Sequence, residues 1–304
     1  MKPSFIGIGA QKCASTWLHQ ILASHPSINV PAIKEADFFS YRYDHGFQWY
    51  ERLFSERGPK VQAGEVSPSY FHDPAAPARV LAYKPDIKIL LTLRDPVQRA
   101  MSNHRHEVRL GHFSGSDLSF EAGLANNPMY VEQGLYAKHL ANWLRCFPRR
   151  QIHVVLVEDI EMNPQAVAHD VFQFLGIDAN FRPDVLTKRF NKSISSRFDS
   201  LFRAKERMYG MTRVPGFAWI WSMACELGLR RLYRQLNTAG PDAALPSMRL
   251  DTERELRDRF MTDIEQLEQM LGRSLAHWGH QGGVEHSDSH GLASANEMEQ
   301  WPAQ

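Results

Sequence analysis

Short apolar runs alternate along this chain with segments whose apolar residues recur at helical spacing. Three of the runs, at 4–9, 88–93 and 152–157, have the length and apolar character of buried strands. Strands that alternate with helices favour a parallel sheet with crossover helices. The pattern therefore predicts an α/β fold with a central, mostly parallel sheet flanked by helices.

The helical pattern is clearest in three segments. Residues 15–24 and 164–175 place their apolar side chains on one side, and each segment follows a predicted strand. Residues 250–272 form a longer amphipathic pattern, for which Asp251 or Thr252 is the expected N-cap.

One domain spanning 1–280 accounts for this organisation. Residues 195–245 are helical in pattern and rich in Arg, Trp, Phe and Met, so we expect a helical lid or insertion there. Its Trp-rich part at 216–222 could cover an acceptor, pack against the sheet, or form the interface of a homodimer. Residues 281–304 turn polar, with Gly, Ser, His and Asn, and predict a disordered tail.

Composition and charge exclude several classes of protein. The chain has 304 residues and a formal net charge of +1, whereas nucleic-acid-binding proteins usually show a basic excess, so we expect no nucleic-acid partner. The three cysteines form neither a CxxC pair nor a zinc spacing, which argues against a disulfide framework and a metal site. No window approaches the roughly 18 apolar residues of a membrane span, and no signal peptide is evident. We therefore expect a cytoplasmic protein without a membrane span.

The loop after the first predicted strand has the composition of an anion-binding site. The sequence GAQKCASTWL leads into a helix, whose N-terminus offers free backbone N–H groups and the positive end of the helix dipole. Cys13 and Ala14 are small, Lys12 adds a cation, and Ser15 and Thr16 add hydroxyls. The loop is P-loop-like but not a Walker A motif, because Lys12 does not directly precede the hydroxyl residues. A capped turn without a ligand explains the loop equally well.

A second polar loop follows the strand predicted at 88–93. Arg94 comes just after the carboxyl end of this strand, where ligands bind in open α/β sheets. Asp95 and Pro96 suit the start of a helix, and Ser102 follows about two turns later. Arginine is a natural bidentate partner of phosphate. The alternative is a structural ion pair between Arg94 and a nearby carboxylate.

Together the two loops resemble the sulfotransferases that use 3′-phosphoadenosine 5′-phosphosulfate (PAPS). GAQKCASTWL is similar to the 5′-phosphosulfate loop of that family, and RDPVQRAMS to its 3′-phosphate segment. KEADFF, GEVSPSYF, GLYAKHLANW, FLGI, FNKS and GRSLAHW also have counterparts in order, most similar to heparan sulfate 3-O- and N-sulfotransferase domains and their bacterial relatives. The resemblance runs from about residue 4 to 278 and is poor near 195–245.

The resemblance implies roles for the residues at matching positions. Lys12 would contact the 5′-phosphosulfate and compensate charge as the bridging oxygen leaves. Arg94 and Ser102 would hold the 3′-phosphate, and Glu35 would be the general base on the acceptor. The remaining residues of the first loop would bind the donor mainly through their backbone; they are Cys13, Ala14, Ser15, Thr16 and Trp17.

The identity of the base stays open. Without the resemblance, a surface ion pair with Lys34 or Arg42 would be the better explanation of Glu35. His106 is a second candidate for a catalytic base, and a histidine satisfied by neighbours or solvent is its alternative. PAPS chemistry needs no metal, so the expected co-substrate is PAPS alone.

The sequence also departs from the heparan sulfate enzymes. Val66 stands where they carry a lysine, so heparan sulfate itself is a poor expectation. Tyr41, Tyr43, Trp49 and Tyr50 could line an acceptor cleft or belong to the core. We therefore expect transfer to a hydroxyl, less readily an amine, of a carbohydrate or small molecule. The alternatives are a P-loop-type nucleotide kinase or hydrolase and a non-catalytic nucleotide binder.

Overall fold

A computed structural model describes most of the chain, namely residues 1–54, 62–113, 118–187 and 245–279. The lid predicted at 195–245 lies outside these ranges except for its last residue, and the tail predicted at 281–304 lies outside them entirely. Within the described ranges, every helix is too short or too polar to span a lipid bilayer.

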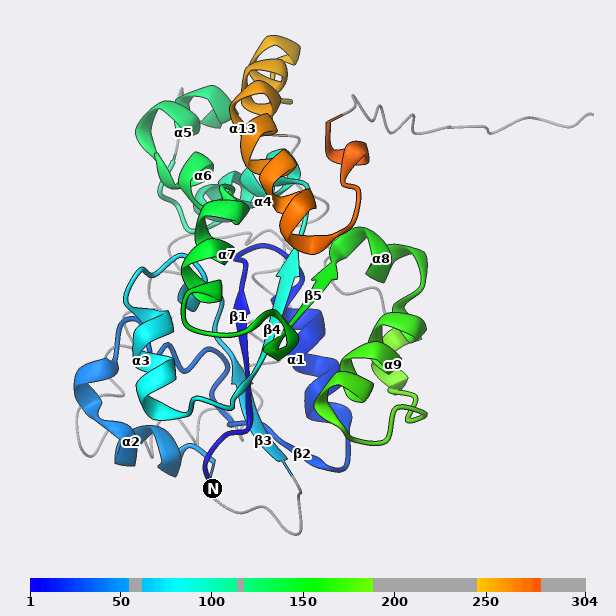
Figure 1. Ribbon diagram of the computed structural model, residues 1–304. Coiled ribbons are helices and arrows are strands. Elements are labelled where there is room, and N and C mark those ends of the chain that lie inside the picture. The colour runs from blue at the N-terminus through cyan, green and yellow to red at the C-terminus, as the bar shows by residue number, and fades with distance from the viewer. Residues whose placement is uncertain (55–61, 114–117, 188–244, 280–304) are drawn as a thin grey trace, which may run out of the picture.

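Five strands, all paired in parallel, form the central sheet in the order β2-β3-β1-β4-β5 (Figure 1). β1 lies at the centre, where Phe5 is opposite Gly64 of β3 on one side and Lys88 of β4 on the other. The predicted α/β fold is confirmed, although β2 and β3 were not predicted. The strands are β1 (Phe5–Gly9), β2 (Ile28–Asn29), β3 (Gln62–Val66), β4 (Lys88–Leu93) and β5 (Ile152–Leu156).

Helices cover both faces of this sheet (Figure 1). α1 and α9 pack on one face, while α3, α7 and part of α13 pack on the other. The helices are α1 (Ser15–Ser24), α2 (Phe47–Arg52), α3 (Ala76–Tyr83), α4 (Pro96–Arg109), α5 (Phe120–Asn126), α6 (Met129–Glu132), α7 (Tyr136–Leu144), α8 (Val157–Met162), α9 (Pro164–Leu175) and α13 (Leu250–Leu271).

The strand residues alternate between two cores, because successive side chains of a strand point to opposite faces. In β4, Ile89 and Leu91 belong to the core under α3 and α7, whereas Leu90 belongs to the core under α1 and α9. Both sides of the sheet are therefore buried, which explains why the central strands are almost continuously apolar.

The start of α13 differs from the prediction. Its N-cap is Arg249, and no side chain caps it, so the prediction of Asp251 or Thr252 as the cap is wrong. The backbone N–H of Arg249 instead donates to a carboxylate oxygen of Glu121 on α5 at 2.8 Å. The start of α13 is thus held by a contact with another helix.

Candidate active site

The carboxyl ends of the parallel strands open into one cleft of about 1220 Å³. This is the edge at which ligands bind in open α/β sheets. The loops after β1 and β4 line the cleft beside α4, and segments near the ends of β3 and β5 line its two sides. The predicted site residues that line it are Lys12, Ala14, Ser15, Thr16, Trp17, Glu35, Arg94, Ser102 and His106.

The loop after β1 has the backbone geometry of an anion site. Lys12 and Ala14 are left-handed, with φ of 68° and 60°. Alternation of left-handed and ordinary residues forms a concavity of backbone N–H groups, called a nest, that binds anions. Ala14 is also the N-cap of α1 and makes no side-chain hydrogen bond. The first turn of α1 therefore keeps donors for a ligand.

Cys13 packs into the core beneath the sheet-to-helix loop and does not line the cleft. Its side chain is fully buried, and its Sγ lies 3.6 Å from the Tyr136 hydroxyl. Burial raises the pKa of the thiol to about 11, so Cys13 stays protonated at neutral pH. A contribution of Cys13 to a ligand through its backbone is compatible with this position.

The ammonium group of Lys12 is in an environment that opposes its charge. Burial, and next the nearby Arg109, lower the pKa of Lys12 to about 8, although Glu35 and Glu107 act in the other direction. A bound anion would reverse this effect, since an opposite charge favours the protonated lysine.

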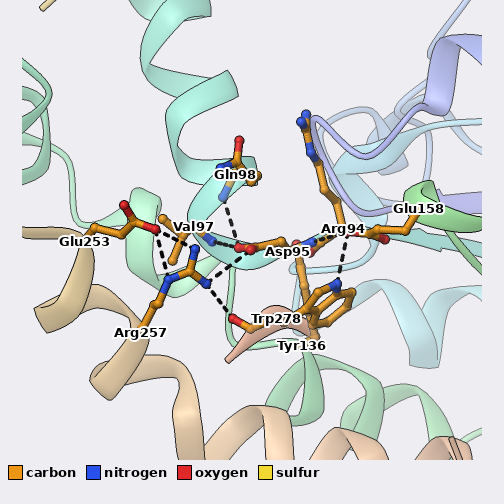
Figure 2. Close-up of polar contacts among 9 residues, drawn as sticks. All are labelled: Arg94, Asp95, Val97, Gln98, Tyr136, Glu158, Glu253, Arg257 and Trp278. Carbon is orange, nitrogen blue, oxygen red and sulfur yellow. Dashed lines mark hydrogen bonds and ion pairs between the residues drawn. The ribbon is translucent and has the colours of Figure 1, made fainter. Parts of the chain in front are cut away.

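The second loop places the guanidinium group of Arg94 at the cleft. In the described part of the chain, no hydrogen bond or ion pair occupies the Arg94 side chain, so the expected alternative of a structural ion pair is not observed. Figure 2 shows this side chain directed away from the Asp95 carboxylate. Asp95 caps α4 as predicted, accepting from the backbone N–H groups of Val97 at 2.7 Å and Gln98 at 3.2 Å.

One face of α4 adds two cations that the sequence analysis missed. Ser102, Arg105, His106 and Arg109 all line the cleft. Their spacing of three and four residues places them on one side of the helix. The helical spacing from Ser102 is the signal that could have found Arg105 and Arg109.

Glu35 lies at the other side of the cleft and is ion-paired. Its carboxylate is 2.9 Å from Lys34 Nζ and 42% exposed. Lys34 also donates to the Thr16 hydroxyl at 2.9 Å, so it joins Glu35 to the first turn of α1. The surface ion pair with Lys34 is therefore observed, and the same carboxylate lines the cleft. Arg42 instead donates to the Ala36 carbonyl.

Asp37 is a second carboxylate in the cleft that the sequence analysis missed, although it belongs to KEADFF. It accepts a hydrogen bond from the Ser69 hydroxyl at 2.6 Å. Its backbone N–H donates to the Ser67 hydroxyl at 2.9 Å. Burial raises the pKa of Asp37, and the bond from Ser69 partly opposes this.

A fully buried carboxylate, Glu65, supports the segment of Glu35 and Asp37. Ser67 and Tyr70 each donate to it at 2.6 Å, and Tyr50 donates at 3.2 Å. Burial raises the pKa of Glu65 to about 7, against the effect of these hydroxyl donors. The Ser67 hydroxyl accepts from the backbone N–H of Asp37 and donates to Glu65. Glu65 therefore supports the segment that carries Glu35 and Asp37 through the side chain of Ser67.

His106 has an environment that disfavours a bound proton. Burial, and then the charges of Lys12 and Arg109, lower the pKa of His106 to about 4. The imidazole is therefore neutral at physiological pH, and the cations oppose the imidazolium that a general base must form.

The four aromatic residues that could line an acceptor cleft differ in exposure. Tyr41 is 70% exposed and lines the cleft. Tyr50 is fully buried, and Tyr43 and Trp49 pack against the core. In the described cleft, Tyr41 is thus the member of this set that an acceptor could reach.

Comparison with known proteins agrees with this geometry. Residues 2–208 match the family model described as the sulfotransferase domain. Human heparan sulfate glucosamine 3-O-sulfotransferase 3B1 is 35% identical over 185 residues, which cover 58% of this chain and 46% of that protein. Mouse bifunctional heparan sulfate N-deacetylase/N-sulfotransferase 4 is 30% identical over 203 residues, or 59% of this chain and 23% of that protein. The matches thus span less than half of each of these relatives.

A solved structure extends the similarity to the fold. The crystal structure of a sulfotransferase from Alicyclobacillus acidocaldarius is 26% identical, with a TM-score of 0.67, and the match covers 92% of this chain and 100% of that one. With the family match over residues 2–208, the conclusion is plain: this chain belongs to the sulfotransferase domain family.

Proposed function

We propose that this protein transfers a sulfuryl group from PAPS to a hydroxyl, less readily an amine, of a carbohydrate or small-molecule acceptor. One observation carries the proposal. Lys12 and Arg94 follow adjacent parallel strands and line the same cleft, and among the described residues neither side chain has a carboxylate within ion-pair distance. Two unpaired cations on one cleft suit a donor with an anion at each end.

The donor would lie across the ends of β1 and β4. Lys12 and the first turn of α1 would bind the 5′-phosphosulfate, with Ser15 and Thr16 as hydroxyl donors. Arg94 and Ser102 would bind the 3′-phosphate. Sulfuryl transfer resembles phosphoryl transfer, in which positioning and charge compensation supply most of the catalysis. Lys12 would then stabilise the negative charge that grows on the leaving oxygen.

The acceptor would enter on the side of Glu35 and Asp37. Glu35 would take the proton from the attacking hydroxyl, and Tyr41 would offer an aromatic surface on which a sugar or aryl ring can stack. Two carboxylates line this side of the cleft, and Lys34, the cation beside them, is already paired with Glu35. A polyanionic acceptor would meet repulsion there, so a neutral acceptor is favoured over heparan sulfate.

Donor binding is tested by calorimetric titration with 3′-phosphoadenosine 5′-phosphate, with ATP in parallel and no added magnesium. We expect micromolar or tighter binding of the bisphosphate and much weaker binding of ATP. Arg94→Met should remove this preference. If the bisphosphate does not bind, and a repeat of the ATP titration with added magnesium gives tight binding, the nucleotide kinase or hydrolase would be supported instead, which the family assignment does not favour.

The role of Glu35 is tested by Glu35→Gln. We expect a fall in turnover of about a hundredfold or more, the usual contribution of a general base, with unchanged affinity for the bisphosphate. A wild-type rate would exclude Glu35 as the base and leave His106 as the candidate.

A further inference from the structure

The backbone around Arg94 belongs to a closed set of polar contacts that reaches the C-terminal part of the chain (Figure 2). The N–H of Asp95 and the indole N–H of Trp278 donate to the same oxygen of Glu158, at 3.1 Å and 3.0 Å. Arg257 on α13 donates to the Trp278 carbonyl and, at 3.3 Å, to Asp95 Oδ2. We call Asp95, Glu158, Trp278 and Arg257 the polar ring.

Tyr136 connects the polar ring to both loops of the cleft. Its hydroxyl donates to the Arg94 carbonyl at 2.9 Å and lies 3.6 Å from Cys13 Sγ. Its ring packs against Trp278, with centroids 6.0 Å apart. The side chain is fully buried, so one hydroxyl group in the core contacts both loops.

The polar ring holds the main chain at Arg94, and none of its four members contacts the Arg94 guanidinium group. Asp95 uses Oδ1 to cap α4 and directs Oδ2 to Arg257. Arg257 is only 8% exposed and is also held by Glu253 at 2.6 Å. Figure 2 shows the Arg94 side chain leaving the ring on the side away from Trp278.

We propose that Arg257 and Trp278 are positioning residues of the donor site, which hold the Arg94 main chain so that its guanidinium faces the 3′-phosphate. The proposal rests on the proposed function, in which Arg94 binds that phosphate. Both residues lie beyond 2–208, the range that matches the family model. The C-terminal helix would therefore complete a site whose proposed donor-binding residues, from Lys12 to Ser102, lie in the first part of the chain.

The physical reason is the cost of an unpaired charge. Without Arg257, Oδ2 of the buried Asp95 would lose its cation, and an uncompensated buried charge is strongly unfavourable. The Asp95 carboxylate would rotate toward solvent, or water would enter beside it. The peptide bond that joins Arg94 to Asp95 would move with it. Bidentate recognition of phosphate tolerates little error, since functional geometry must hold within about 0.5 Å.

The test compares two nucleotides that differ only in the 3′-phosphate. Calorimetry on the full chain measures the dissociation constants of 3′-phosphoadenosine 5′-phosphate and of adenosine 5′-monophosphate. Arg257→Met keeps most of the side-chain volume. We expect it to raise the dissociation constant of the bisphosphate about tenfold and that of the monophosphate less than about twofold. Trp278→Phe removes the indole N–H together with part of the ring and should have a smaller effect in the same direction. If Arg257→Met does not fold, Trp278→Phe decides.

The matched control is Arg259→Met, on the same helix. Arg259 pairs with Glu255 at 2.6 Å on the exposed side of α13, away from the polar ring, so both affinities should stay at the wild-type values. The double variant with Arg94→Met shows whether Arg257 acts through Arg94. We expect no further loss of bisphosphate affinity in the double variant.

Two results would overturn the positioning role: an unchanged ratio of the two affinities in Arg257→Met and Trp278→Phe, whether or not both nucleotides bind more weakly, or additive losses in the double variant. Failure of the proposed function looks different. In that case the wild type itself would not distinguish the nucleotides, or Arg94→Met alone would bind the bisphosphate normally.

Discussion

Lys12 leads to a prediction about how donor binding depends on pH. Its pKa is lowered to about 8, chiefly by burial and then by Arg109. The 5′-phosphate that we propose it binds would raise this pKa again, because an opposite charge favours the ammonium form. Binding and protonation of Lys12 are therefore linked.

The magnitude follows from the two pKa values. Lowering the pKa from 10.5 to about 8 corresponds to roughly 3 kcal/mol of unfavourable free energy for the charged lysine. The bound state has the higher pKa, so affinity is full below the pKa of the free enzyme and is lost as pH rises above it. Between about pH 8 and the pKa of the bound state, affinity should fall about tenfold per pH unit.

The assay is calorimetric titration with 3′-phosphoadenosine 5′-phosphate at pH values of about 7, 8 and 9, each in two buffers of different ionisation enthalpy. Near pH 9 we expect the uptake of about one proton on binding. Neighbouring groups do not interfere, since burial raises the pKa of Cys13 to about 11 and also raises that of Tyr41. Lys12→Arg should bind independently of pH, because arginine keeps its charge throughout.

Constant affinity up to about pH 9 without proton uptake would refute this reasoning. Lys12→Met then separates the two causes. A large loss of affinity near neutral pH would mean that Lys12 binds the phosphate with an ordinary pKa. No loss would mean that Lys12 does not touch the ligand.

Three further predictions concern stability and the base. Burial raises the pKa of Glu65 from 4.5 to about 7, so the folded state binds this proton more tightly than the unfolded state. The free energy of unfolding should therefore fall by up to about 3 kcal/mol as pH rises from about 4.5 to 7. Urea denaturation of Glu65→Gln should not show this dependence on pH. The same dependence in the variant would mean that Glu65 is not its cause. Asp263 on α13 accepts from the N–H groups of Ala137 and Lys138 at 2.9 Å and 3.1 Å. It caps α7 from another helix, so Asp263→Ala should cost about 1–2 kcal/mol in urea denaturation, and Asp263→Asn less. His106 has a pKa lowered to about 4, so kcat/KM should show no His106-dependent inflection between about pH 5.5 and 7.5. An inflection in that range that disappears in His106→Gln would show that the imidazole is more solvated than the structure indicates.

The features that the sequence predicted well are local. The strand before Lys12 and the strand before Arg94 are apolar runs that end in polar loops, and parallel pairing then brings the two loops together. Glu35 comes after β2, and Ser102 lies on α4, which begins just after β4. Both residues therefore reach the cleft at the carboxyl edge of the sheet.

The features that it missed depend on contacts between distant segments. β3 contains Gly64 and Glu65, which interrupt the apolar pattern of a strand. Gly64 is needed because the ring of Phe5 occupies the place of a side chain there. Glu65 is tolerated because hydroxyl groups satisfy it. Neither reason is visible from local periodicity, and the same holds for the start of α13.

The bond between Arg257 and Asp95 joins residues 162 positions apart. Contacts of such large sequence separation form late, because the intervening chain must first pay the entropy of loop closure. During synthesis, the segments of a chain emerge from the ribosome in order from the N-terminus. The Arg94 loop would therefore leave the ribosome long before the helix that fixes it. A nascent chain would already contain every residue proposed to touch the donor but would bind it about tenfold more weakly, so full donor affinity would be reached only after synthesis has passed Trp278.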